Sequence, residues 1–179
     1  MKYLTLSALA VVASLMWLGQ PARADLPSWC TNPPGQTLVF EGAASADAKS
    51  GDSAGTSDAK WGSYDQQVKD SDAAASLRQT CAVQTSGATR TWNLLFAAMD
   101  LTSISAAYHR IAGVLNGPWV GALPPGLTAD NLRAGASGAR NSGQVNRSAA
   151  QAVFKKITRT YGSDQVKVYN GLHAMLFGS

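Results

Sequence analysis

A serine-hydrolase motif is the first pattern in this sequence that suggests chemistry. Gly51-Asp52-Ser53-Ala54-Gly55 has the G-x-S-x-G spacing of the nucleophile elbow, in which a strand-to-helix turn lifts the serine toward a base and an oxyanion hole. Residues 42–60 contain only Gly, Ala, Ser, Thr, Asp and Lys, so neither a strand before Ser53 nor an apolar helix after it is expected. Ser57 and Lys60 match S-x-x-K in the same setting, without the apolar cover that a reactive lysine needs. Neither motif is predicted to be catalytic.

The other groups that could perform catalysis are few. His109 and His173 are the only histidines, and Asp100 is about 13 Å from His109 along a predicted helix, too far for a catalytic triad. Glu41 is the only glutamate, so a pair of carboxylates for glycoside hydrolysis is not expected. No catalytic residue, metal site or cofactor is predicted. The alternative is a small hydrolase in which His173 meets a serine remote in sequence.

Two features suggest binding instead. Basic residues follow one another along the segment 146–161, namely Arg147, Lys155, Lys156 and Arg159, and they can attract an anionic partner. Trp119 lies in the loop 117–127, rich in proline and glycine, and a large aromatic residue on a stiff loop is a common anchor in protein recognition. The ordinary alternatives are a solvated helix face and a tryptophan that folds back onto the core.

The N-terminus predicts export. Lys2, an apolar run up to Leu18 and the sequence Ala22-Arg23-Ala24 form the pattern of a cleaved signal peptide, so residues 1–24 are expected to be removed and the mature chain to be soluble and periplasmic or secreted. An oxidising compartment favours a disulfide between the two cysteines, Cys30 and Cys81. No transmembrane segment is expected in the mature chain.

Charge is divided unevenly along the chain. Residues 25–75 contain eight acids and three lysines, whereas residues 76–179 contain ten basic residues and three acids. One hypothesis is that the acidic segment 42–60 covers a basic surface. The small net charge left after removal of the leader, together with export, argues against nucleic acid as a partner.

The elements expected from periodicity are mostly helices. Residues 25–41 are expected to be extended, with an edge strand at 37–40, and residues 42–60 to be a flexible, acidic, low-complexity insert. The helical domain, 61–179, is expected to contain these elements: a short helix from Ser71 or Asp72 toward Cys81, a long core helix at 91–115, a helix at 128–133 that ends at Gly135, a polar connector at 135–144, a helix at 146–161, and a last helix from Ser163 for which a strand is the alternative.

The sequence therefore predicts a mainly α protein, a single small helical domain with one disulfide between Cys30 and Cys81. Its expected function is non-catalytic binding of another macromolecule in the cell envelope, as an inhibitor, immunity factor, chaperone or assembly adaptor. The partner is expected to be a protein or an anionic envelope polymer.

Overall fold

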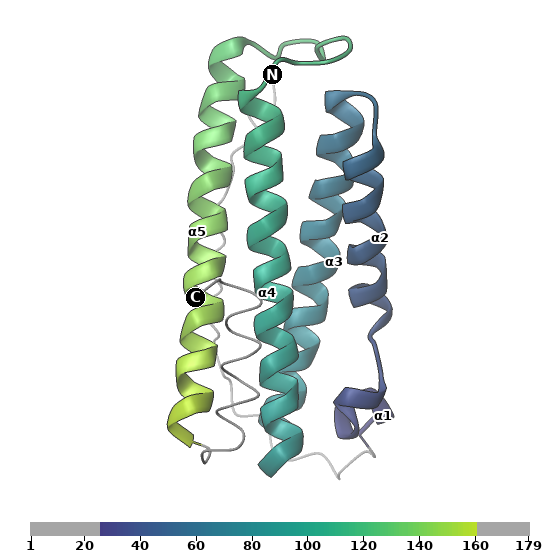
Figure 1. The fold of residues 1–179 in the computed structure, drawn as a ribbon, viewed down its shortest axis with the longest axis vertical. Coiled ribbons are helices and arrows are strands. Elements are labelled where there is room, and N and C mark those ends of the chain that lie inside the picture. The colour runs from purple at the N-terminus through teal and green to yellow at the C-terminus, as the bar shows by residue number, and fades with distance from the viewer. Residues whose placement is uncertain (1–25, 161–179) are drawn as a thin grey trace.

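The structure, a computed structural model, describes residues 26–160, and these form a helical bundle (Figure 1). The long helices are α2 (Val39–Ser53), α3 (Ser57–Gln84), α4 (Gly87–Asn116) and α5 (Ala129–Thr160). A short helix, α1 (Ser28–Thr31), and a 3-10 turn, η1 (Pro33–Gly35), precede them. No strand occurs in this described range, so the predicted mainly α fold is confirmed.

The long helices run up and down in chain order, and each packs along its neighbours in sequence. α3 lies between α2 and α4, and α4 lies between α3 and α5 (Figure 1). The connections from α2 to α3 and from α3 to α4 are short, which is the usual way to join antiparallel helices. The only long connection within the described range, residues 117–128, joins α4 to α5 at one end of the bundle.

The core has two apolar clusters that α3, α4 and α5 share. In the first, Phe154 of α5 is fully buried among α4 side chains such as Leu101 and Ile104. In the second, Tyr64 of α3, Ile111 and Leu115 of α4 and Leu132 of α5 pack together. Many of the remaining core residues are alanines, which lets the helix axes approach closely.

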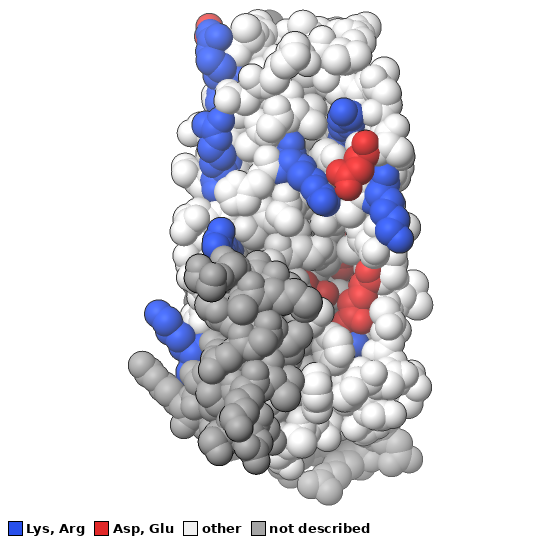
Figure 2. Space-filling model, viewed as in Figure 1, with Lys and Arg blue, Asp and Glu red and all other residues white. Residues whose placement is uncertain are grey.

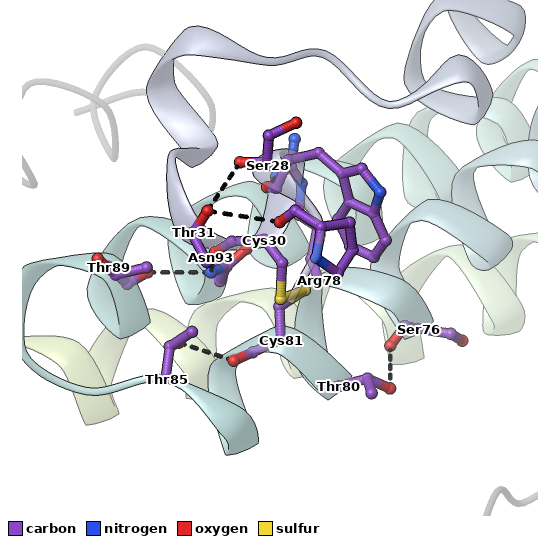
Figure 3. Close-up of a disulfide and its surroundings, with 12 residues drawn as sticks. Ser28, Cys30, Thr31, Ser76, Arg78, Thr80, Cys81, Thr85, Thr89 and Asn93 are labelled. Atoms are coloured by element: carbon purple, nitrogen blue, oxygen red, sulfur yellow. Dashed lines mark hydrogen bonds between the residues drawn. A yellow bond between two sulfur atoms is a disulfide. The ribbon is translucent and has the colours of Figure 1, made fainter. Parts of the chain in front are cut away.

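A disulfide and a buried arginine fasten the N-terminal residues to α3. The predicted bond between Cys30 and Cys81 is present and buried (Figure 3). Asn93 of α4 donates a hydrogen bond to the carbonyl oxygen of Cys30 at 2.9 Å. Arg78, one turn before Cys81, donates to the backbone oxygens of Trp29 and Gln36 and to the carboxylate of Glu41.

The prediction of a flexible insert at 42–60 is wrong, because all of these residues except the turn 54–56 lie in α2 and the first turn of α3. The segment has no large apolar side chain, but small residues are sufficient for packing at close range. Ala44 and Gly51 of α2 are buried, and the Tyr64 hydroxyl donates to Asp52 at 2.8 Å. Thr56 caps α3 by accepting a hydrogen bond from the Ala59 N–H.

The predicted edge strand at 37–40 is also wrong, since Val39 and Phe40 begin α2. The Glu41 side chain accepts a hydrogen bond from the Leu38 N–H at 2.8 Å, which satisfies one backbone donor at the start of this helix. The segment 25–41, expected to be extended, is extended only in part, because α1 and η1 lie within its described residues.

The predicted break at Gly135 and the connector at 135–144 are absent, because α5 runs without interruption from Ala129 to Thr160. The helices predicted at 128–133 and 146–161 are parts of it. Gly143 faces α4, where a Cβ would lie 3.3 Å from the carbonyl oxygen of Ser105, so the glycine permits close packing. The core helix expected at 91–115 is confirmed as α4, and the short helix toward Cys81 is part of α3. The last predicted helix, from Ser163, lies outside the described residues.

Candidate binding surfaces

Three arginines of α5 recur at intervals of seven residues, at positions 133, 140 and 147. Seven residues advance a helix by about 10.5 Å and return it to within about 20° of the same direction, so these side chains form a line. Lys155 lies eight residues beyond Arg147, about 12 Å further along the helix and about 80° around it, and borders the C-terminal end of this line. We call Arg133, Arg140, Arg147 and Lys155 the α5 basic row. Figure 2 shows lysine and arginine side chains in a column along this edge of the bundle.

The α5 basic row has little acidic charge beside it on its own helix. Asp130 is the only acid in α5, and it pairs with Arg133. Arg133 and Arg140 are exposed, and Arg147 is partly buried. A row of cations with one acid at its end creates a positive potential along the helix, which attracts anionic surfaces over a distance of about 8 to 10 Å at ordinary salt concentrations.

Only part of the basic set predicted from the sequence belongs to the α5 basic row. Arg147 and Lys155 belong to the row, whereas Lys156 lies about 180° around the helix from Arg147 and does not. The side chain of Arg159 is outside what the structure describes. Arg133 and Arg140 were missed, because the sequence prediction divided this helix at Gly135. The signal that reveals them is the seven-residue spacing of arginine, combined with small or apolar residues at Leu132, Ala136, Ala139, Gly143 and Ala150.

Trp119 does not stand out as an exposed anchor. It is partly buried against the second core cluster, and its Nε1 donates to the Ala122 carbonyl oxygen at 3.3 Å. The fold therefore favours the interpretation that Trp119 covers the end of the core. Its neighbours Val120 and Leu123 are the exposed apolar residues of the loop, with 55% and 48% of their surface accessible.

Ser57 fixes this loop over the start of α3. The Ser57 N–H donates to the Val120 carbonyl oxygen at 2.9 Å, and the Val120 N–H donates to the Ser57 hydroxyl oxygen at 2.9 Å. Because Ser57 is buried and Val120 is exposed, this reciprocal pair is partly shielded from water. The loop residues nearest α4 are therefore held in place.

A cleft of about 420 Å³ opens beneath the fixed loop, between the first turns of α3 and the last turns of α4. Its polar side chains include Lys60, Tyr64 and Arg110, and its apolar side chains are Val114, Pro118 and Val120. The Arg110 guanidinium is 3.5 Å from Asp52 and 3.4 Å from the Gln67 side-chain oxygen, and its Cζ lies 5.6 Å from the centre of the Tyr64 ring. Burial, together with the hydrogen bond and the negative charge of Asp52, raises the pKa of Tyr64.

Within residues 26–160, the side chains considered for catalysis are not assembled into a site. Ser53, the serine of the G-x-S-x-G motif, is exposed at the end of α2, and its hydroxyl donates to backbone oxygens of the same helix, those of Lys49 and Ser50. His109 is exposed on α4, and His173 lies outside the described residues.

Asp100 is the ionisable group with the most perturbed pKa among the described residues. Burial and the negative charge of Glu41 raise the pKa of Asp100 to about 8, partly offset by the positive charge of Arg78. One of its carboxyl oxygens is buried without a hydrogen bond. Its neighbours are the groups that fasten the N-terminal residues, so we interpret it as part of the packing between the elements.

The acidic segment 42–60 does not lie over the α5 basic row. α2 packs on α3, at the opposite edge of the helix array from α5 (Figure 1). The hypothesis that this segment covers the basic surface of α5 within one chain is therefore wrong.

Comparison with known proteins finds no matching family model, no matching curated protein and no matching solved structure. Among the described residues, no cluster of three or more His, Cys, Asp or Glu side chains has the arrangement of a metal site. Within the same range, none of the helices is both long enough and apolar enough to cross a membrane.

Proposed function

We propose that this chain is an exported, non-catalytic binding protein that holds an acidic partner protein against the α5 basic row. The observation that carries the proposal is the alignment of Arg133, Arg140 and Arg147 on one face of a helix in which Asp130 is the only acid. The signal-peptide pattern of residues 1–24 and the Cys30–Cys81 disulfide support export to an oxidising compartment.

The spacing of the row indicates the shape of the partner surface. A partner helix with carboxylates every seven residues advances at the same 1.5 Å per residue, so it can meet each arginine in turn. Each exposed pair contributes less than about 1 kcal/mol, so the row sets orientation and association rate, and apolar contacts must supply much of the affinity. The complex should therefore weaken with added salt.

The test compares two triple variants with the same change in net charge. One replaces Arg133, Arg140 and Arg147 with Glu, and the control replaces Lys49, Lys69 and Arg90 with Glu, on α2, α3 and α4. Partners cross-linked in the native envelope are identified by mass spectrometry, and the affinity of the purified partner is then measured at two salt concentrations. The row variant should bind at least about tenfold more weakly than the control. Equal binding by the two variants would contradict the proposal.

An anionic envelope polymer is the second candidate, because the row attracts any regular array of negative charge. A flexible polymer responds to total charge more than to the position of the arginines. In that case the row variant and the control should lose binding to the purified polymer to similar extents, and no stoichiometric protein partner should be recovered.

A further inference from the structure

The cleft between α3 and α4 is a built site separate from the α5 basic row. Its rim is fixed by the two hydrogen bonds between Ser57 and Val120. Gly55 and Gly113 line it from the α2–α3 turn and from α4, and a Cβ added at either position would meet no atom within 4 Å. The space is therefore open to a ligand, and its volume of about 420 Å³ is within the usual range for small-molecule sites.

Two cationic side chains, those of Lys60 and Arg110, line the cleft, and each can make a further interaction with a ligand. Lys60 is partly buried, and its ammonium takes part in none of the ion pairs found among the described residues. Arg110 makes contacts of 3.4 and 3.5 Å with Gln67 and Asp52, longer than the 2.7–2.9 Å typical of a charge-assisted hydrogen bond. Both contacts are therefore weaker than a charge-assisted hydrogen bond of ordinary length.

The charge balance of the cleft favours a singly charged anion. Lys60 and Arg110 contribute two positive charges. Asp52, which pairs with Arg110 and accepts a hydrogen bond from the Tyr64 hydroxyl, contributes one negative charge. The remainder is a single positive charge beside an apolar wall formed by Val114, Pro118 and Val120. A carboxylate satisfies the charge, and an aliphatic group attached to it contacts the wall.

We propose that this cleft binds a carboxylate carried on a small apolar group, which Lys60 and Arg110 hold by charge while Val114, Pro118 and Val120 contact the apolar part. Two sources share this chemistry, a free aliphatic acid and the C-terminal residue of a peptide. The inference is independent of the proposed function, because none of the cleft residues belongs to the α5 basic row.

The test is a titration of the oxidised protein, followed by amide chemical shifts. The probes are 4-methylpentanoate, its neutral amide 4-methylpentanamide, a short leucine-ended peptide with a free C-terminus, the same peptide amidated, and inorganic phosphate. The carboxylate probes should shift the amide signals of Gly55, Gly113 and Gly117, and the neutral amides should bind at least about tenfold more weakly. A peptide that binds more tightly than the free acid identifies the peptide source, and the reverse order identifies the small acid.

Three cleft variants and one control complete the test. Lys60→Gln and Arg110→Gln should each weaken carboxylate binding. Gly113→Leu should block it by filling the open space, and leucine is a better helix former than the glycine it replaces in α4. Lys49→Gln, outside the cleft, should bind as the wild type does. Thermal unfolding of each variant checks that the fold is intact. The proposal is overturned by equal binding of acid and amide, by tighter binding of phosphate, by unchanged binding in Gly113→Leu, or by no shift up to about 10 mM probe.

Discussion

The Nε of Arg78 in α3 lies 2.7 Å from Oε1 of Glu41 in α2, although 37 residues separate the two in sequence. The arginine side chain is completely buried, with its guanidinium 4.6 Å from the centre of the Phe96 ring. The same guanidinium donates to the backbone oxygens of Trp29 and Gln36 at 2.8 and 2.9 Å. The buried Arg78 side chain therefore binds the N-terminal part of the chain at three residues, and the nearby disulfide attaches it at a fourth, Cys30.

Replacing Arg78 with Met should strongly destabilise the protein. The methionine fills part of the space, but it leaves Oε1 of Glu41 and two backbone oxygens without their donor, and Oε2 of Glu41 keeps only the Leu38 N–H. Removing one partner of a buried ion pair typically costs about 3–5 kcal/mol, and urea denaturation of the oxidised protein measures the loss. Arg140→Met, at an exposed position of α5, is the control and should change the free energy of unfolding by less than about 0.5 kcal/mol. Similar midpoints for the two variants would contradict this assignment.

The buried carboxyl of Asp100 should make the protein less stable as the pH rises. Because the pKa of Asp100 is about 8 in the folded state and about 3.9 in an unfolded chain, the folded state retains a proton that the unfolded state releases between these values. The free energy of unfolding should then fall with rising pH in this window, by up to about 1.4 kcal/mol for each pH unit from this group.

Asp100→Asn tests that pH dependence, because the amide is neutral at every pH and has nearly the shape of a protonated carboxyl. The variant should be more stable than the wild type at pH 8, and its advantage should shrink toward pH 5. Urea denaturation at a series of pH values measures the difference, and Asp58→Asn, at an exposed position in the first turn of α3, is the control. An Asn variant that is less stable than the wild type at pH 8 would show that the ionised carboxylate is stabilising.

The sequence predicted the parts of this fold that depend on large side chains and failed where small ones do the packing. The apolar spacing from Leu94 to Leu115 was sufficient to identify α4, and two cysteines behind a predicted signal peptide were sufficient to predict the disulfide. α2 could not be recognised in the same way, because a segment of Gly, Ala, Ser and Asp resembles a disordered linker in composition. The surface of α3 on which α2 packs can be identified only from the structure.

The candidate sites, like the fold, were predicted only in part from the sequence. Arg147 and Lys155 were found from local charge, but Arg140 lay in a stretch interpreted as a connector, so the row was not seen. The cleft combines the start of α3, the end of α4 and a loop, and no local pattern connects Lys60 with Arg110 across the 50 residues between them.

The contact between α2 and α3 predicts a specific cost for adding one methyl group. A Cβ on Gly51 would lie 2.7 Å from Cδ1 of Tyr64, so the tyrosine ring or the helix must move. We expect Gly51→Ala to lower the free energy of unfolding by about 1–3 kcal/mol, despite the better helix propensity of alanine. Gly62→Ala is the control, since its Cβ meets nothing within 4 Å on the exposed side of α3, and it should stabilise by about 0.5–1 kcal/mol. Stabilisation by both substitutions would mean that α2 does not pack on α3 in this way.

A pair of glycines in α5 distinguishes a continuous helix from the connector that the composition suggests. A Cβ on Gly138 meets nothing within 4 Å, whereas a Cβ on Gly143 would lie 3.3 Å from the Ser105 carbonyl oxygen and 3.3 Å from Nε2 of His109. The histidine side chain can move aside, but the backbone oxygen moves only if α4 and α5 separate. Gly138→Ala should therefore stabilise the protein by about 0.5–1 kcal/mol, and Gly143→Ala should destabilise it relative to the wild type. In a flexible connector neither position would be packed, and the two substitutions would have nearly equal effects in thermal unfolding.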